Sequence, residues 1–271
     1  MFTTEDGARR YQEVLVPLMF APSARQLVAG AKLPAGAQVV DVATGTGVVA
    51  RAAAAAAGSA GRVVAVDAAG SMLALARSQP AAPGSAPIEY IESAIENAAL
   101  SNSAFDAAFC QQALQFFEDP ARVLGRIRGA LRADGRLHVA LWGSDEEHPL
   151  TMAMQRALIE CRLRDLTWFL AKVHRLHNPA LVTGVLRQGG FVVESHEKVD
   201  LRPDGTWYAS DGRKLLAATP LAARLAELPP EKLAELGDAC ERQLENYTRG
   251  GDPHGELDLV FPANFYIVRP A

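Results

Sequence analysis

The alternation of strand-like and helix-like runs over the first half of the chain restricts its fold more than any other feature. Short apolar runs are each followed by a longer segment whose apolar residues recur at helical spacing. Strands that alternate with helices form βαβ units with parallel strands and right-handed crossovers. The expected strands are Gln38 to Val42, Arg62 to Val66, Ile88 to Ile91, Phe105 to Cys110 and Arg136 to Trp142. The expected helices begin near Gly47, at Ser71 and at Pro120. The pattern predicts a doubly wound α/β domain.

The remaining segments favour helices. Residues 8–30 carry apolar residues at helical spacing, but Pro17 and Pro22 predict that this stretch breaks into short helices. Residues 149–181 and 215–247 are also predicted to be helical. Two further strands are expected, at Phe191 to Val199 and at Leu257 to Val268. We expect one domain over residues 1–271, with segments 8–30, 149–181 and 215–247 as helical lid elements over the core.

Composition excludes several functional classes. The 271 residues are 49% hydrophobic and 21% charged, which is typical of a globular protein. The net charge of -4, without a dense Lys/Arg run, argues against a nucleic-acid partner. Three cysteines far apart predict neither a disulfide framework nor a metal site. No secretory signal or apolar stretch of membrane-spanning length is expected. These features favour a cytoplasmic protein. A monomer and a homodimer both remain possible.

The strongest local motif is V-V-D-V-A-T-G-T-G-V-V-A, from Val39 to Ala50. It reads as a strand that ends in an acid, followed by a turn of small residues that opens a helix. Glycine allows a ligand to approach the backbone, and the helix N-terminus offers unpaired N–H groups. A turn without a ligand and a dinucleotide site both remain alternatives, because Gly45, Gly47 and Ala50 also fit G-x-G-x-x-G/A. Asp41 favours S-adenosylmethionine (SAM), since a carboxylate repels a pyrophosphate and attracts the ammonium group of a methionine-like ligand.

The second strand also ends in an acid, Asp67. A carboxylate in this position can accept hydrogen bonds from both ribose hydroxyls. The motif therefore indicates a nucleoside. Alternatively, Asp67 could be an acid near the N-terminus of the next helix, where the helix dipole favours a negative charge. Met72 could cover the adenine or belong to the core.

Together these motifs resemble the class I SAM-dependent methyltransferases, especially bacterial small-molecule enzymes similar to the ubiquinone/menaquinone-biosynthesis C-methyltransferases. The resemblance spans residues 38–142 and implies a seven-stranded, mostly parallel, Rossmann-like sheet whose last strand is antiparallel. It is carried by D-V-A-T-G-T-G (41–47), V-V-A-V-D-A-A-G-S-M-L (63–73), F-D-A-A-F-C-Q-Q-A-L-Q-F-F-E-D-P (105–120) and L-R-A-D-G-R-L (131–137).

The resemblance also implies which residues bind the cofactor. They are Asp41, Ala43, Thr44, Gly45, Gly47, Asp67, Ala68, Met72, Ser93, Ala94, Ile95, Gln111 and Gln112. Ser93 is a departure, because family members usually carry an Asp there to hold the adenine amino group. The turn from Leu131 to Leu137 also departs from the common L-x-P-G-G-R-L.

Residues for the acceptor are expected at the carboxyl edge of the sheet, where ligands of open α/β sheets lie. The candidates are Tyr11, Phe20, Gln115, Phe116 and Trp142. No catalytic base is evident: His138 lies in an apolar strand, while His174 and His177 share a helical face without metal partners.

The expected function is transfer of a methyl group from SAM to a small molecule, such as an aromatic, quinone or polyketide-like metabolite, with release of S-adenosylhomocysteine (SAH). A SAM-binding protein with a different role remains an alternative, because fold analogy does not exclude it. A NAD-dependent oxidoreductase is the other alternative.

Overall fold

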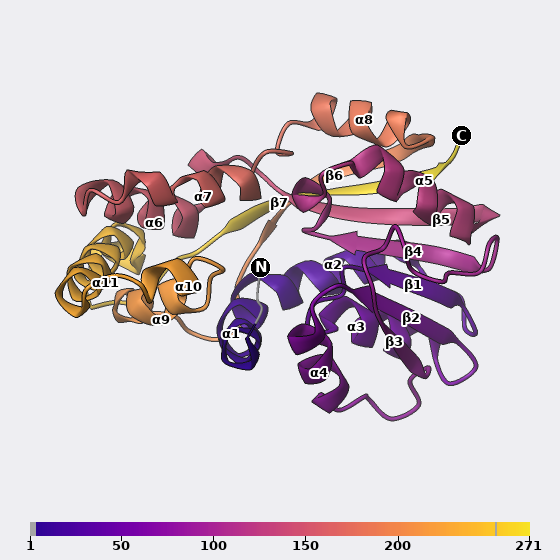
Figure 1. Cartoon of the computed structure of the whole chain (residues 1–271), viewed down its shortest axis with the longest axis horizontal. Helices are drawn as coiled ribbons and strands as arrows, with labels where there is room; N and C mark the ends of the chain where they lie inside the picture. The colour runs from indigo at the N-terminus through magenta and orange to yellow at the C-terminus, as the bar shows by residue number, and fades with distance from the viewer. Residues whose placement is uncertain (1–3, 253) are drawn as a thin grey trace.

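The computed structural model describes residues 4–252 and 254–271. One seven-stranded sheet, with strand order β3-β2-β1-β4-β5-β7-β6, forms its centre (Figure 1). β7 runs antiparallel to both of its neighbours, β5 and β6, whereas the pairings among β1 to β5 are parallel. This order confirms the predicted doubly wound, mostly parallel sheet with an antiparallel last strand. The strands are β1 (Gln38–Val42), β2 (Arg62–Asp67), β3 (Ile88–Glu92), β4 (Phe105–Gln111), β5 (Leu131–Trp142), β6 (Phe191–Leu201) and β7 (Phe261–Pro270).

Successive strand residues point to opposite faces of the sheet, and both faces are covered. In β1, Val39 joins a core that includes residues of α2 (Ala21–Ala31) and α3 (Val48–Ala57). Its neighbour Val40 joins a second core that includes residues of α5 (Pro120–Ala130) and α8 (Pro179–Gln188). Burial on both faces explains the continuous apolar runs that predicted these strands.

The remaining helices include single-turn and longer ones. Single-turn helices are η2 (Leu114–Phe116), η3 (Asp145–Glu147), η4 (Arg164–Leu166), η5 (Ala209–Asp211), η6 (Glu245–Tyr247) and η7 (Arg249–Gly251). The longer helices are α1 (Glu5–Arg10), α4 (Gly70–Ser78), α6 (Pro149–Glu160), α7 (Trp168–Val173), α9 (Gly212–Ala217), α10 (Ala222–Leu225) and α11 (Pro230–Leu244).

The N-terminal segment corrects one prediction. Residues 8–30 do not break at the prolines, because α1, the π-helix η1 (Tyr11–Phe20) and α2 follow one another without interruption. Pro17 lies inside η1, where the wider i→i+5 pattern is seen as the amide of Ala21 donates to the carbonyl of Val16. Pro22 is the second residue of α2, and its missing N–H removes one bond from the continuous stretch without ending it.

This continuous stretch corrects a second expectation. Glu5–Ala31, at 27 residues, is the one helix among the described residues that is long and apolar enough to cross a membrane by length and composition. Of its most apolar window, 56% is buried inside the protein, and a core helix passes the same test. The prediction of no apolar stretch of that length is wrong because it assumed short helices.

Other differences concern boundaries. The segment from Leu215 to Leu225 divides into α9 and α10, and β7 begins at Phe261 rather than Leu257. Leu131–Leu137, predicted as a turn, is an irregularity within β5, where the register with β4 shifts.

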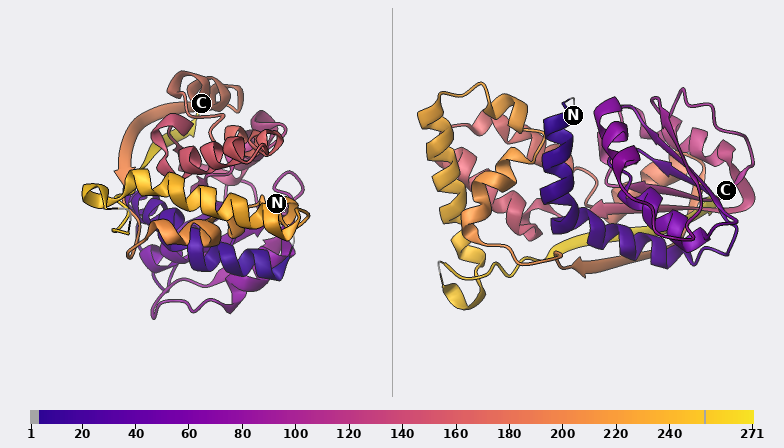
Figure 2. Two further views of the ribbon diagram at one scale, coloured as in Figure 1. Left: turned by 90° about the vertical axis from the view of Figure 1, so that its left-hand side faces the viewer. Right: turned by 90° about the horizontal axis from the view of Figure 1, so that it is seen from below.

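Helices α6, α7, α9, α10 and α11 gather beyond one end of the sheet, with α1 between them and the sheet (Figures 1 and 2). α8, whose first residues fall in predicted segment 149–181, instead packs against α5 and β6. Segments distant in the sequence therefore meet near the carboxyl ends of β1, β4 and β5.

Candidate functional site

The turn after β1 presents its backbone to a ligand. Ala43, Gly45 and Gly47 have positive φ angles of 56°, 56° and 78°. The amide of Thr44 donates to the carbonyl of Val66 at 3.0 Å, which ties the turn to β2. A Cβ atom on Gly45 would meet no atom within 4 Å, so the space beside it is open. The turn thus leaves room for a ligand at the N-terminus of α3.

Asp41 lies beneath this turn and is only 1% exposed. The hydroxyl of Thr44 donates to its Oδ2 at 2.5 Å. Burial raises the pKa of Asp41 from 3.8 to about 7. Hydrogen bonds from Thr44 and from the Ala50 amide lower this pKa, and the charge of Arg51 lowers it by a smaller amount. A buried carboxyl group whose charge is incompletely balanced attracts a cationic ligand group.

Arg51 was not predicted as part of this site. Its guanidinium donates to the carbonyl of Thr46 at 2.6 Å, inside the glycine turn. Burial lowers the pKa of Arg51, while Tyr90 and Asp41 raise it. Arg51 follows Gly47 by one helical turn, so its spacing could have indicated a contact.

Asp67 is held by the backbone at the end of β2. Its Oδ2 accepts from the Gly45 amide and its Oδ1 from the Ala69 amide, each at 2.8 Å. Burial raises the pKa of Asp67, and these amides oppose the rise. Because an ionised carboxylate has about four acceptor positions, Asp67 can still accept bonds from ligand hydroxyls. Ala68 is exposed beside it, and Met72 on α4 is buried.

The end of β3 lies against Asp67. The amide of Ser93 donates to the Asp67 carbonyl at 2.9 Å. The Ser93 hydroxyl donates to the carbonyl of Ala94, also at 2.9 Å. Ile95, predicted to cover the adenine, is buried with the core that contains Val40. Ser93 and Ala94 therefore border the open end of the site, where a nucleoside is expected.

Three glutamines at the end of β4 and just after it form a largely buried polar group. Gln111 Nε2 donates to the carbonyl of Phe20 at 3.2 Å, and Gln112 Oε1 accepts from the Trp142 amide at 2.9 Å. Each side chain also has a buried polar atom without a partner: Oε1 of Gln111, Nε2 of Gln112 and Oε1 of Gln115. Buried polar atoms are nearly always hydrogen-bonded, so these three are expected to meet polar ligand atoms.

Aromatic side chains lie beside this group of glutamines. The ring centroids of Tyr11 and Phe20 are 4.9 Å apart, and those of Phe20 and Trp142 are 5.9 Å apart. Burial, and then the charges of Asp67 and Asp41, raise the pKa of Tyr11. We call Tyr11, Phe20 and Trp142 the aromatic row. It links three predicted acceptor residues into one structure.

Among the described residues, Phe116 makes its ring contacts with α7 and not with the aromatic row. Its ring stacks on Phe169 of α7 at 6.3 Å, and the Lys172 ammonium lies 5.9 Å from its centroid. The structure therefore connects Phe116 to α7 rather than to Trp142.

Sequence analysis missed a buried polar chain behind Trp142. Thr151 Oγ1 lies 3.1 Å from His148 Nδ1 and 2.9 Å from His174 Nε2. His174 Nδ1 lies 2.8 Å from the carbonyl oxygen of Gly143. His174 caps α7 and does not share a helical face with His177 as predicted. Only the spacing of His148 and Thr151 on one helical turn could have signalled this chain.

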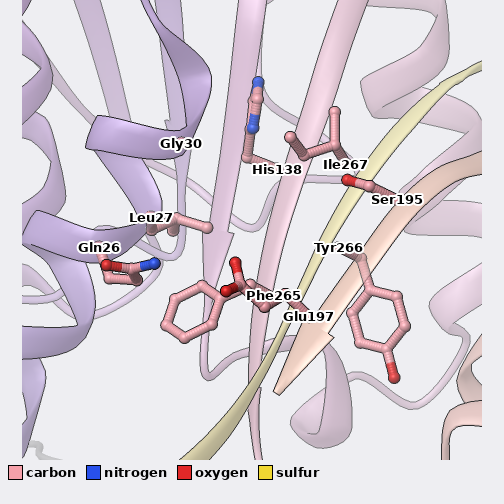
Figure 3. A pocket seen from close by; sticks show the side chains of 9 residues that line it. All are labelled: Gln26, Leu27, Gly30, His138, Ser195, Glu197, Phe265, Tyr266 and Ile267. Atoms are coloured by element: carbon pink, nitrogen blue, oxygen red, sulfur yellow. The ribbon is translucent and has the colours of Figure 1, made fainter. Parts of the chain in front are cut away.

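A small cavity elsewhere does not serve as the site. It has a volume of about 60 Å³ and lies between α2 and the strands β5 to β7, with His138, Ser195 and Glu197 in its wall (Figure 3). A water molecule occupies about 30 Å³ in the liquid, so a metabolite does not fit. His138 stacks on Phe109, and burial lowers its pKa to about 4, as expected of a core histidine. Among residues 4–252 and 254–271, no cluster of three or more His, Cys, Asp or Glu side chains could hold a metal.

Comparison with known proteins relates part of the chain to a family model. Residues 40–139 match the family model of a methyltransferase domain. This range contains both acids and the glycine turn, and the match agrees with SAM as the expected cofactor. No curated protein matches the sequence.

Solved structures share the fold. A putative methyltransferase from Bacillus halodurans C-125 is 20% identical with a TM-score of 0.60, covering 92% of this chain and 99% of its own. Phosphoethanolamine N-methyltransferase 2 of Haemonchus contortus, in complex with SAM, is 16% identical with a TM-score of 0.58, covering 98% of this chain and 57% of its own. The cyclase SpnF is 18% identical with a TM-score of 0.54, covering 92% of this chain and 80% of its own. At these identities, the likeness establishes the fold alone.

Proposed function

We propose that this protein, whose residues 40–139 match a methyltransferase domain, transfers a methyl group from SAM to a small-molecule acceptor. The observation that carries the proposal is the pair of acids at the ends of β1 and β2, on either side of an open glycine turn. Buried Asp41 suits the ammonium group of SAM, and Asp67 suits its ribose. A pyrophosphate in place of the ammonium would be repelled by Asp41, which argues against NAD.

The residues of the site divide between the two ends of the cofactor. Asp67, Ala68 and Ser93 would hold the nucleoside at the more exposed end. The unpartnered amide atoms of Gln111 and Gln112 would bind the methionine portion at the buried end. When bound, SAM supplies a methyl group on a positively charged sulfur, and SAH leaves with the electron pair of the broken bond. The chain's main contribution is to hold the acceptor aligned in a dry pocket.

The aromatic row supports an apolar or aromatic acceptor, such as a quinone or polyketide-like product of secondary metabolism. Segments 8–30, 149–181 and 215–247 would cover this acceptor as a lid. The N-terminal segment carries Tyr11 and Phe20, and Gln111 donates to the carbonyl of Phe20 at 3.2 Å, which supports this role. We place the protein in the cytoplasm, since Cys110, Cys161 and Cys240 are free and buried. We expect a monomer or a homodimer.

Binding by two matched glycine variants tests the cofactor site. Gly45 and Gly58 both have positive φ, and a Cβ on either meets nothing within 4 Å. Gly58→Val is the more demanding control, because Gly58, at φ 67° and ψ 174°, has a backbone conformation that essentially only glycine adopts. Only Gly45→Val should lose SAM and SAH binding in calorimetry, because only Gly45 borders the acids. Unchanged SAM affinity in folded Gly45→Val contradicts this site.

Transfer is tested separately with methyl-labelled SAM and cell extracts, followed by mass spectrometry of the labelled product. Label in a small molecule supports the proposal. SAM binding without labelled products would favour a different reaction, and the structural likeness to the cyclase SpnF makes that the second candidate.

A further inference from the structure

A second cavity lies at the edge of the sheet that β3 forms. It has a volume of about 400 Å³ and is lined by the end of α4, the loop before β3, β3 itself and Arg51 of α3 (Figure 1). Arg77 and Pro87 in its wall are exposed, so the cavity is open to solvent. Pockets for small molecules have volumes of roughly 300–1,000 Å³. This cavity is therefore large enough for a small metabolite, unlike the one beside His138.

The floor of the cavity is distant from the ribose acid. Ile88, in the wall, pairs with Val63 near the start of β2, whereas Asp67 ends β2. These four residues of strand correspond to roughly 13 Å. The loop before β3 lies at the amino end of that parallel strand, while the glycine turn lies at the carboxyl end of β1. The cavity is therefore a separate place from the one that suits the nucleoside.

Two guanidinium groups in the wall are held by neutral acceptors. Arg51 donates to the carbonyl of Thr46 at 2.6 Å, and Arg77 donates to the carbonyl of Tyr90 at 3.2 Å. Among the described residues, neither arginine has a carboxylate within 4.0 Å. A guanidinium has five N–H donors, so these bonds leave several donors on each arginine for a ligand.

The ring of Tyr90 brings the two cations to one cavity. The guanidinium of Arg77 lies 5.8 Å from the centroid of this ring. A Cβ atom on Gly47 would lie 3.0 Å from Arg51 Nη1 and 3.2 Å from the Tyr90 hydroxyl oxygen, so these two atoms converge beneath the glycine turn. Burial raises the pKa of Tyr90, and the charges of Arg51 and Arg77 oppose the rise. Both positive charges therefore act on the same part of the cavity wall.

The rest of the wall does not neutralise these charges. None of its described residues is an acid. Side chains alternate along β3, so Ile88 and Tyr90 face the cavity, whereas Glu89 faces the other way and pairs with Arg62. Asp41 acts on Arg51 only as the smallest of the effects on its pKa. The remaining wall is largely apolar and includes Ala76, Ala81, Pro87 and Ile88.

We propose that this cavity binds a phosphate monoester of a small organic compound, at a site separate from the SAM site. A phosphate monoester carries a charge of about −1.5 to −2 at pH 7, which two guanidiniums balance better than they balance a single carboxylate. The planar fork of arginine also matches the spacing of phosphate oxygens. The apolar wall holds the organic part, because inorganic phosphate alone would leave most of the cavity empty. This binding site goes beyond the proposed methyl transfer and does not depend on it.

Calorimetry with phenyl phosphate tests the site, on free protein and on protein saturated with SAH. At about pH 8 the probe is a dianion, since the second pKa of such an ester is about 6. It should bind at a single site in both samples. Phenol should bind at least about tenfold more weakly, because it lacks the charge-assisted bonds. Inorganic phosphate should also bind at least about tenfold more weakly, because it lacks the apolar ring.

Two matched pairs of variants locate the bound probe. Arg77→Gln should weaken phenyl phosphate by about tenfold. Arg62→Gln should leave its affinity unchanged, because Arg62 is outside the wall and paired with Glu89. Ala81→Phe should fill the cavity and abolish binding. Ala82→Phe is its control, because Ala82 is the adjacent residue, is equally exposed and does not line the cavity. SAH binding to all four variants shows that they are folded.

Several outcomes would overturn this inference. Equal losses in Arg77→Gln and Arg62→Gln would mean that general surface charge attracts the probe. Phenol that binds as tightly as phenyl phosphate would contradict an anion site, and inorganic phosphate that binds as tightly would contradict the organic part of the ligand. Competition between SAH and phenyl phosphate would place the probe in the cofactor site. Failure of SAM and SAH to bind contradicts the proposed function alone, because phenyl phosphate can still be titrated into the free protein.

Discussion

At the scale of single residues, Asp41 couples ligand binding to pH. Its pKa in the folded protein, about 7, is higher than the ordinary 3.8. Its stabilising contribution is therefore fully present below about pH 4 and is lost as the pH rises through about 7. The ammonium group of SAM favours the ionised form, so binding should release a proton, and SAM affinity should fall about tenfold per pH unit below 7.

Calorimetry in buffers of different ionisation enthalpy measures this proton release. Asp41→Asn should weaken SAM binding, abolish the released proton and flatten the pH dependence between about pH 5 and 7. An unchanged proton release in this variant would assign the titration to another group.

Ser93 supplies a second prediction at this scale. Ser93→Asp should make the free energy of SAM binding more favourable by about 1 kcal/mol. The reason is that a carboxylate accepts a stronger hydrogen bond from the adenine amino group than a hydroxyl does. Nearby Glu92 and the desolvation of the new carboxylate reduce this gain. The control ligand is a SAM analogue with hydrogen in place of the amino group. Similar effects on both ligands would show that Ser93 lies away from the adenine edge.

At the scale of elements, α8 depends on a glycine to pack against α5. A Cβ on Gly189, which follows α8, would overlap the side chain of Leu124. Gly189→Ala should lower the free energy of unfolding by about 1–3 kcal/mol, as overpacking does. Gly184, inside α8, meets nothing within 4 Å, so Gly184→Ala should instead stabilise by about 0.5–1 kcal/mol. Urea denaturation of the pair tests the packing, and equal effects would contradict it.

The elements also show what sequence patterns can predict. The strands followed from apolar runs, and Asp41 and Asp67 followed from their position at strand ends, because periodicity determines local structure. Pro17 misled the prediction, since tertiary packing of Leu15 and Leu18 keeps η1 helical despite the missing donor.

Contacts between distant segments could not be predicted. His148 and His174 meet through Thr151 only because α6 and α7 pack beside the end of β5. No local pattern encodes the contact of Thr151 with His174 across 23 residues, so the sequence could indicate at most the His148–Thr151 half of this polar chain. The cofactor acids belong to local motifs, whereas the acceptor side of the site depends on tertiary packing.

At the scale of the whole molecule, ligand binding should stabilise the fold. SAH at a hundredfold excess over its Kd adds about 2.7 kcal/mol to the free energy of unfolding. This gain corresponds to a rise of roughly 5–10 °C in Tm for a chain of this size. NADH at the same concentration should leave Tm unchanged. Scanning calorimetry measures Tm with each ligand. A rise in Tm with NADH would support the dinucleotide alternative.

The contacts of Tyr11 with Phe20, and of Phe20 with Trp142 and Gln111, have a kinetic consequence for the proposed lid. In that proposal, the N-terminal helical stretch has to move aside before a ligand reaches the buried end of the site. Association should therefore take place in two steps, and its observed rate should level off at high SAM concentration, at the rate of that opening. The rate at which the helical stretch opens, rather than the rate of collisions with SAM, would then limit SAM binding.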